Sequence, residues 1–485
     1  MKRLIVRDTL NNRKACLSIK GKEVLTSEFR GPEKPEYVLT CSHRDSHTHP
    51  VLYPLFFGAL EPVMLNETTD KAEILDKLRK KEGDGPIVAY EYKLTAGLTA
   101  RDLEEFGRDV WLVDSSFHSG VASRRLLNKI SERKGTFMFG EFSSKMISED
   151  YNFLAMAIME EQAREKGIAR AVKWMKARIA EGTTSMDEKL VMTETGWDIF
   201  KAASKEVKNE LGYQPIRSVY VSHNIFIRNP KKYADEAGEL GIPLGVKWIA
   251  DGGLGSKTAA LEHYSYSDGS KGQLTLPVDI RDIQNAGDYA MMLRYSGIRR
   301  LACHAIGDLA IGIMLNAVPE FRNAGIDVSL EHFELPTRSQ IDTAAAMGLP
   351  LSLQPNYSTE VWRYAPWLGE AATSINPLKT LLNAYSKNGA EDRIRFGTDG
   401  MPQSMLWAIA CGVNHPLGKE RISIGEAVRH SRDPGGIMVL KNETYERLQE
   451  PTLKKDSESR EASAARLHDG VVLVARYKRI LHTVF

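Results

Sequence analysis

The hydrophobic and polar positions of the chain change period along its length. From about residue 149, long segments with helical periodicity alternate with short apolar or β-branched runs that predict strands. Together with a run at 37–41, the predicted strands number eight, and the later ones lie near 183–186, 216–221, 245–250, 301–304, 328–332, 349–354 and 393–399. Such alternation is typical of parallel strands with right-handed crossovers, and eight strands predict a closed (β/α)8 TIM barrel of the α/β class. An open doubly wound sheet is the alternative, but no G-x-G-x-x-G follows any strand.

The two ends of the chain and one internal stretch depart from this rhythm. Short alternating segments fill 1–36, and strand-like runs return at 470–475 and 480–481, so we expect a small composite β domain from 1–36 and 433–485. The barrel would then span 37–432. Within it, 51–148 breaks the alternation at a strand end, and its apolar content argues against disorder. It predicts an inserted, cap-like subdomain.

Composition narrows the function classes. With 485 residues, 42% hydrophobic content and a formal net charge of +2, the chain can bury a large core and has no strong field for nucleic acid or an anionic membrane. No apolar run approaches the roughly 20 residues of a membrane span, and the first charges come too early for a signal peptide. We expect a cytoplasmic protein with a small-molecule substrate. Whether it forms a homodimer is left open. The four cysteines lie far apart and form no C-x-x-C pair, so they suggest neither a disulfide framework nor a thiolate zinc site.

A histidine pair stands at the end of the first predicted strand. His47 and His49 are two residues apart, so on an extended strand both imidazoles point to the same side. Two neutral imidazoles form half of a site for a borderline metal such as zinc. An H-x-H pair alone occurs often by chance. It indicates a metal site only if residues downstream can supply the remaining ligands.

Several such residues stand at equivalent places in the repeating pattern. The carboxyl ends of barrel strands face one common mouth, and the polar side chains there are His47, His49, His304, His332 and Asp399, with Lys247 inside its strand. Scattered core histidines would not be expected to follow the strand pattern in this way.

At these residues the chain resembles the metal-dependent amidohydrolase superfamily, and within it the YtcJ-like amidohydrolases (amidohydrolase family 3). The matching segments span 45–402 in order and read DSHTHP, GVKWIADGGLGSKTAAL, HAIGDLAI, LEHFEL, SLQPNY and FGTDGMP, with weaker EGTTSMD and FHSGVAS. The resemblance implies one or two divalent ions, usually zinc, held by His47, His49, His304, His332 and Asp399. Lys247 would correspond to a carbamylated lysine that bridges two ions; an ordinary lysine paired with an acid is the alternative.

The function implied is hydrolysis of an amide or related C–N bond by metal-activated water. Asp399 is the expected catalytic residue, as proton acceptor from water and donor to the leaving nitrogen. His118, Asp251 and His223 are candidate substrate-binding residues, with local hydrogen bonding as the alternative. An esterase, lactonase or phosphoesterase on the same barrel stays open, as does a non-catalytic scaffold. The segment 90–93 and the tail depart from the family pattern, which leaves substrate specificity and the β domain in doubt.

Overall fold

The computed structural model of the chain describes residues 2–66, 68–115, 117–133, 138, 140–400, 402–449, 464–476 and 479–483. Residues 450–463 of the predicted β domain therefore lie outside the described residues. Within the described ranges, no helix is both long enough and apolar enough to cross a bilayer.

The described strands form one large sheet whose central part is parallel. Eight strands follow one another in chain order, each hydrogen-bonded to the next. They are β4 (Tyr37–Thr48), β10 (Thr183–Val191), β11 (Ile216–Ser222), β12 (Leu244–Ile249), β13 (Arg300–Ala305), β14 (Asp327–His332), β15 (Leu351–Leu353) and β16 (Ile394–Phe396). The α/β class and the positions of the eight strands are confirmed.

A closed barrel, in contrast, is not shown. The strand order ends at β16, and no ladder between β16 and β4 is present among the described residues. Where the two strands approach, the amide of Asp399 donates to the carbonyl oxygen of His47 at 2.8 Å. Because β15 and β16 have only three residues each, they offer little backbone for a closing ladder. This contact nevertheless brings the first and last parallel strands together.

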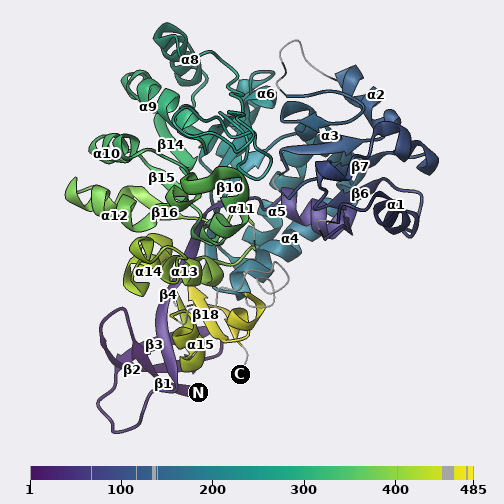
Figure 1. Cartoon of the computed structure of the whole chain (residues 1–485). Coiled ribbons are helices and arrows are strands. Elements are labelled where there is room, and N and C mark those ends of the chain that lie inside the picture. The colour runs from purple at the N-terminus through teal and green to yellow at the C-terminus, as the bar shows by residue number, and fades with distance from the viewer. Residues whose placement is uncertain are drawn as a thin grey trace.

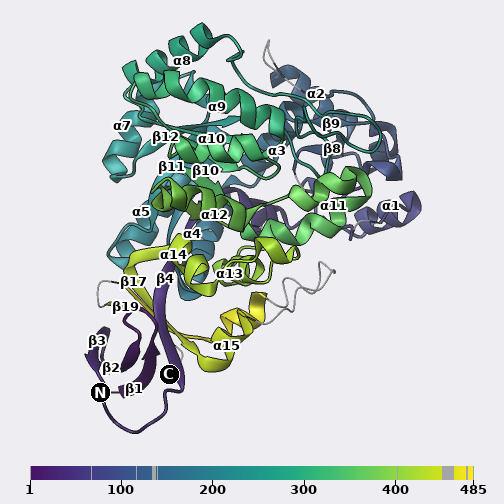
Figure 2. The ribbon, with the colours of Figure 1, turned by 60° about the vertical axis from the view of Figure 1, so that its left-hand side comes forward.

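Helices pack outside the parallel strands (Figures 1 and 2). The longer ones are α3 (Asp150–Gln162), α4 (Arg164–Ala180), α5 (Glu194–Leu211), α7 (Pro230–Leu240), α8 (Ile283–Tyr295), α9 (Asp308–Asn323), α10 (Arg338–Ala346), α12 (Leu378–Lys387), α13 (Met405–Val413) and α14 (Ile424–Ser431). α11 (Val361–Leu368) has eight residues, as α14 does, and α6 (His223–Phe226) has only four. Their ends follow the sequence. α5, for example, is capped at its start by Thr193, whose hydroxyl accepts from the Gly196 amide, and at its end by Gly212, which has φ 75°.

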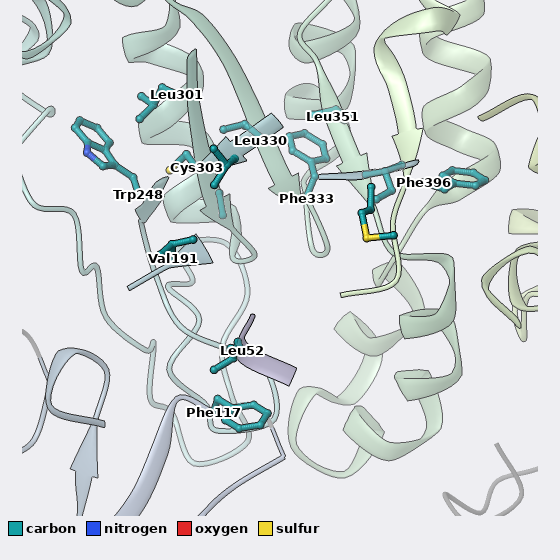
Figure 3. Packing of buried hydrophobic residues seen from close by; sticks show 14 of the residues in the cluster. Leu52, Phe117, Val191, Trp248, Leu301, Cys303, Leu330, Phe333, Leu351 and Phe396 are labelled. Carbon is teal, nitrogen blue, oxygen red and sulfur yellow. The ribbon is translucent and has the colours of Figure 1, made fainter. Parts of the chain in front are cut away.

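The main hydrophobic core lies between strands and helices. Side chains such as Trp248, Leu301, Leu330 and Leu351, one from each of four neighbouring strands, are almost fully buried in one cluster (Figure 3). The strands read as nearly continuous apolar runs because helices cover the sheet, as is typical of parallel strands. The core therefore fixes the register in which the polar strand ends meet.

Strands from both chain ends extend the same sheet. They are β1 (Lys2–Asp8), β2 (Arg13–Lys20), β3 (Glu23–Glu28), β17 (Arg432–Lys441), β18 (Val471–Arg476) and β19 (Arg479–Thr483), with α15 (Asn442–Arg447) following β17. β4 joins them to the parallel strands, because its first half pairs with β1 and β17 and its second half with β10. A separate cluster that includes Leu4, Leu17 and Leu473 holds this part together. The domain boundaries themselves stay a prediction.

The stretch predicted as an insert (51–148) contains its own five-stranded sheet. Its strands are β5 (Val63–Met64), β6 (Ile87–Tyr90), β7 (Val110–Val113), β8 (Ser119–Ala122) and β9 (Ile147–Ser148). A π-helix (Pro54–Leu60), α1 (Lys71–Arg79), two 3-10 helices (Leu94–Ala96 and Ala100–Phe106) and α2 (Arg124–Arg133) complete it. In Figure 1 it lies to one side of the parallel strands, away from β1–β3.

Candidate metal centre

Three of the predicted ligands converge at the meeting point of β4 and β16. Donor atoms of His47, His49 and Asp399 all lie within 4.8 Å of one another. Asp399 Oδ1 is 2.9 Å from His49 Nε2 and 3.5 Å from His47 Nε2. Ligands bound tetrahedrally to zinc at about 2.0–2.1 Å lie roughly 3.4 Å apart, so these separations fit one shared ion. The two histidines are buried and the aspartate is nearly so.

Two glycines of the FGTDG segment allow this approach. A Cβ on Gly397 would lie 2.5 Å from the backbone nitrogen of His47, and a Cβ on Gly400 would lie 2.2 Å from the ring of Tyr53. Gly400 also has φ 80°, which L side chains rarely adopt. Any side chain at either position would push β16 and its aspartate away from β4.

Hydroxyl groups hold the aspartate in place. Tyr357 donates to Asp399 Oδ2 at 2.5 Å, and Tyr53 donates to its backbone carbonyl at 2.6 Å. Asp399 has φ 48°, a left-handed conformation that costs free energy in a residue with a side chain. The site therefore fixes this carboxylate from several directions.

The other two predicted histidine ligands continue the cluster as a row of imidazoles. The ring of His332 lies 4.7 Å from that of His47, and the ring of His304 lies 4.5 Å from that of His332. His332 Nδ1 is 3.9 Å from Asp399 Oδ2, but it donates to Gln354 Oε1 at 2.9 Å. His304 Nε2 donates to the carbonyl of Gly252 at 3.1 Å, so Nδ1 is the ring nitrogen that is left to bind a metal. Neither joins the compact three-residue group, although both lie beside it.

Lys247 is buried next to this row. Its Nζ has no hydrogen-bond partner among the described residues. Burial, together with the nearby Lys189 ammonium, lowers the pKa of Lys247 to about 8, although Glu331 and Asp399 oppose the shift. An amine with this pKa is partly neutral at physiological pH.

Glutamates behind the first histidines orient them, and the sequence interpretation did not include these residues. Glu331 accepts from His47 Nδ1 at 2.7 Å, and Glu188 faces His49 Nδ1 at 3.4 Å. Both rings thereby turn Nε2 toward Asp399, as a carboxylate behind a metal-binding histidine does. The available signal was position: Glu331 directly precedes His332, and Glu188 lies in the second parallel strand, β10, where it pairs with Thr48 of β4.

Neighbouring charges set the protonation of His49 and Asp399. Burial would lower the pKa of His49, but its hydrogen bonds to Asp399 and Glu188 raise it to about 9. Burial would likewise raise the pKa of Asp399, yet the imidazoles of His47 and His49 hold it well below its usual range. Without a metal, His49 and Asp399 therefore form an ion pair, and a divalent cation would displace the proton of the imidazolium.

The predicted substrate-binding residues lie at different distances from the centre. His118 is close: its ring lies 5.3 Å from that of His304, and its Nδ1 donates to Glu149 Oε2 at 2.8 Å. Asp251 is fully buried and accepts from the amides of Ile306, Gly307 and Ala260, which pins the loop after β12. His223 contacts the hydroxyl of Tyr289 at 2.7 Å. Substrate contact by the three residues stays a prediction, and His118 has the best position for it.

Comparison with known proteins identifies the fold. No family profile matches the chain, and no curated protein matches its sequence. Among solved structures, an uncharacterized metal-dependent hydrolase from Pyrococcus horikoshii is similar with a TM-score of 0.61 and 19% identity, over 98% of this chain and 94% of that one. A second, from Pyrococcus furiosus, has a TM-score of 0.59 and 21% identity over 87% and 90%. The 5-methylcytosine deaminase of Klebsiella pneumoniae has a TM-score of 0.50 and 11% identity over 100% and 98%. The chain therefore shares its fold with these solved hydrolase and deaminase structures.

Proposed function

We propose that the chain is a metal-dependent hydrolase of the YtcJ-like amidohydrolase type that cleaves an amide or related C–N bond. The observation that carries this proposal is the convergence of His47, His49 and Asp399, which come from opposite ends of the parallel strand series. The ordered motifs between 45 and 402 support the same assignment. The shared fold with metal-dependent hydrolases and with a deaminase, which also acts at a C–N bond, agrees with it.

The donor set favours zinc. Two imidazoles and one carboxylate suit a borderline divalent ion, and His332 and His304 stand next in the row to supply further nitrogen ligands. When bound, such an ion lowers the pKa of a coordinated water toward ~7 and polarises a substrate carbonyl. Glu331 and Glu188 hold the histidines with their Nε2 atoms toward the ion, so the geometry is set before binding.

The chain itself supplies the proton carrier. Asp399 lies beside the proposed ion, and its ionised carboxylate can accept a proton from the attacking water and return it to the leaving nitrogen. Tyr357 fixes the orientation of Oδ2 by its hydrogen bond. Hydrolysis thus adds hydroxyl to the acyl carbon and a proton to the nitrogen, and the C–N bond breaks.

A second ion would depend on Lys247. Its buried amine, with a pKa of about 8 and no partner among the described residues, suits attack on CO2, which forms an N–C bond and releases a proton. The resulting carbamate would supply oxygen ligands, and His304 and His332 would supply nitrogen ligands to the second ion. Lys247→Ala should then reduce the bound zinc from two ions per chain to one, as measured by elemental analysis.

One experiment tests the function. The purified chain is assayed for zinc content and for hydrolysis of N-acyl amides, cyclic amides, esters, lactones and phosphoesters of matched size. The proposal predicts bound zinc and the highest kcat/KM on a C–N bond. Highest activity on an ester or phosphoester would favour the alternative hydrolases, and a metal-bound chain without any turnover would indicate a scaffold.

A further inference from the structure

Glu149, next to the insert, has a buried side chain and a backbone conformation that local structure does not favour. Glu149 lies between β9 and α3, is fully buried, and has φ 50° and ψ −122°. This backbone conformation suits glycine and is strained for any residue with a side chain. The N-cap position of α3 favours a short side chain that caps the helix, yet Glu149 makes no side-chain cap hydrogen bond. Its side chain and its conformation are both unfavourable for local structure.

The carboxylate points instead to the imidazole row. Oε2 accepts from His118 Nδ1 at 2.8 Å, and the amide of Glu149 donates to the carbonyl of His118, also at 2.8 Å. The two residues are thus joined through both side chain and backbone. A carboxylate on Nδ1 fixes the plane and tautomer of an imidazole and directs its Nε2.

Two connections lead from this pair to His304. The His118 ring packs on the His304 ring at 5.3 Å. The second oxygen, Glu149 Oε1, has no hydrogen-bond partner among the described residues and lies so close to Gly252 that a Cβ there would be 2.6 Å away. The carbonyl of Gly252 is the group that accepts from His304 Nε2. A strained, buried and incompletely satisfied acid therefore accepts a hydrogen bond from one neighbour of His304 and lies close to the other.

We infer that Glu149 is a positioning residue that holds His118 beside His304, so that the insert contributes a substrate-contacting imidazole to the reaction site. The inference rests on the proposed hydrolase function and extends it, since the sequence patterns assign Glu149 no role. Strain of this kind persists where the surrounding structure over-determines it, and it concentrates at functional sites. In this arrangement the chain gives up local stability to orient His118.

The test combines activity with stability. Glu149→Gly removes the carboxylate and relieves the positive φ, whereas Glu149→Gln keeps an oxygen that can accept from His118 Nδ1. We expect Glu149→Gly to keep its zinc and to unfold at or above the wild-type midpoint, while its kcat/KM falls about 10- to 100-fold. Glu149→Gln should recover most of that loss. In the double variant His118→Asn/Glu149→Gly, kcat/KM should match that of His118→Asn alone within about twofold.

Glu420→Ala is the matched control. Glu420 is a similarly buried glutamate that accepts two hydrogen bonds from Thr380, so its loss should lower the unfolding midpoint and leave kcat/KM unchanged. Wild-type kcat/KM in Glu149→Gly, additive losses in the double variant, or a lowered midpoint with loss of zinc would overturn the inference. A wild-type chain that hydrolyses none of the C–N substrates would refute the proposed function instead. The unfolding midpoint of Glu149→Gly would still show whether the backbone at this position is strained.

Discussion

Replacing Glu331 by glutamine should separate stability from metal binding. Glu331 is fully buried and accepts from His47 Nδ1 at 2.7 Å, from Lys189 Nζ at 2.9 Å and from Ser329 Oγ at 2.7 Å. Burial would raise the pKa of Glu331, but Lys189 and His47 hold it well below its usual range, so the group is a carboxylate. Lys189 in turn depends on it: burial would lower the pKa of Lys189, and Glu331 raises it to about 12.

The expected loss follows from the unpaired cation. Glu331→Gln leaves Lys189 buried without a counter-ion, beside the second buried lysine, Lys247. Breaking a buried pair in this way costs about 3–5 kcal/mol. Replacing both partners removes the unpaired charge, so Lys189→Met/Glu331→Gln should lie within about 1 kcal/mol of the wild-type free energy of unfolding. Zinc affinity should behave differently, because both variants lose the carboxylate behind His47 and should bind zinc about 10- to 100-fold more weakly.

Two measurements check this prediction. Urea unfolding of the metal-free proteins gives the stability difference, and competition with a chromophoric chelator gives the zinc affinity. A stability loss below about 1 kcal/mol in Glu331→Gln, or zinc affinity that recovers together with stability in the double variant, would refute the reasoning.

Three further predictions concern the same centre. Dialysis against a chelator should abolish hydrolysis and added zinc should restore it; activity that survives at undetectable metal content would contradict the metal centre. In the metal-free chain, the pKa of His49 is about 9, against an ordinary 6.5. Its protonation should therefore contribute up to about 3 kcal/mol to the free energy of unfolding, fully below pH 6.5 and no longer above pH 9. Urea unfolding between these pH values should show the loss in wild type and not in His49→Asn. Gly400→Ala should lower the free energy of unfolding by about 1–3 kcal/mol and weaken zinc binding, because its φ of 80° and the Tyr53 ring leave no room for a Cβ; unchanged unfolding would show that the loop adjusts freely.

The strand pattern could be predicted because each parallel strand is covered by helices and therefore reads as a short apolar run between helical segments. The polar residues that end these runs, such as His47, His304 and His332, could be placed near one another for the same reason. The pattern extends to Asp399, which lies three residues after β16, a strand of only three residues. Local sequence was sufficient to predict the position of a site residue wherever that residue follows directly from a buried strand.

Contacts between distant loops could not be predicted. Nothing local to Glu149 shows that it accepts from His118, since the two residues meet at the end of the antiparallel pairing of β8 with β9, 31 residues apart in sequence. Lys189 and Glu331 meet across the sheet, from β10 and β14, and no spacing in the sequence relates them. Asp251 stays a predicted substrate contact, and the sequence did not show that its carboxylate accepts from amides up to 56 residues away. The predicted closure of a barrel would depend in the same way on long-range backbone pairing between β16 and β4, which is not present among the described residues.

The most direct test of the metal centre is zinc binding by the dialysed chain and by His47→Ala and Asp399→Ala. The account predicts tight binding to the wild-type chain and a large loss of affinity in each variant, with the folded state kept. Zinc bound equally well by all three chains would show that the ion lies elsewhere and would contradict the proposed site.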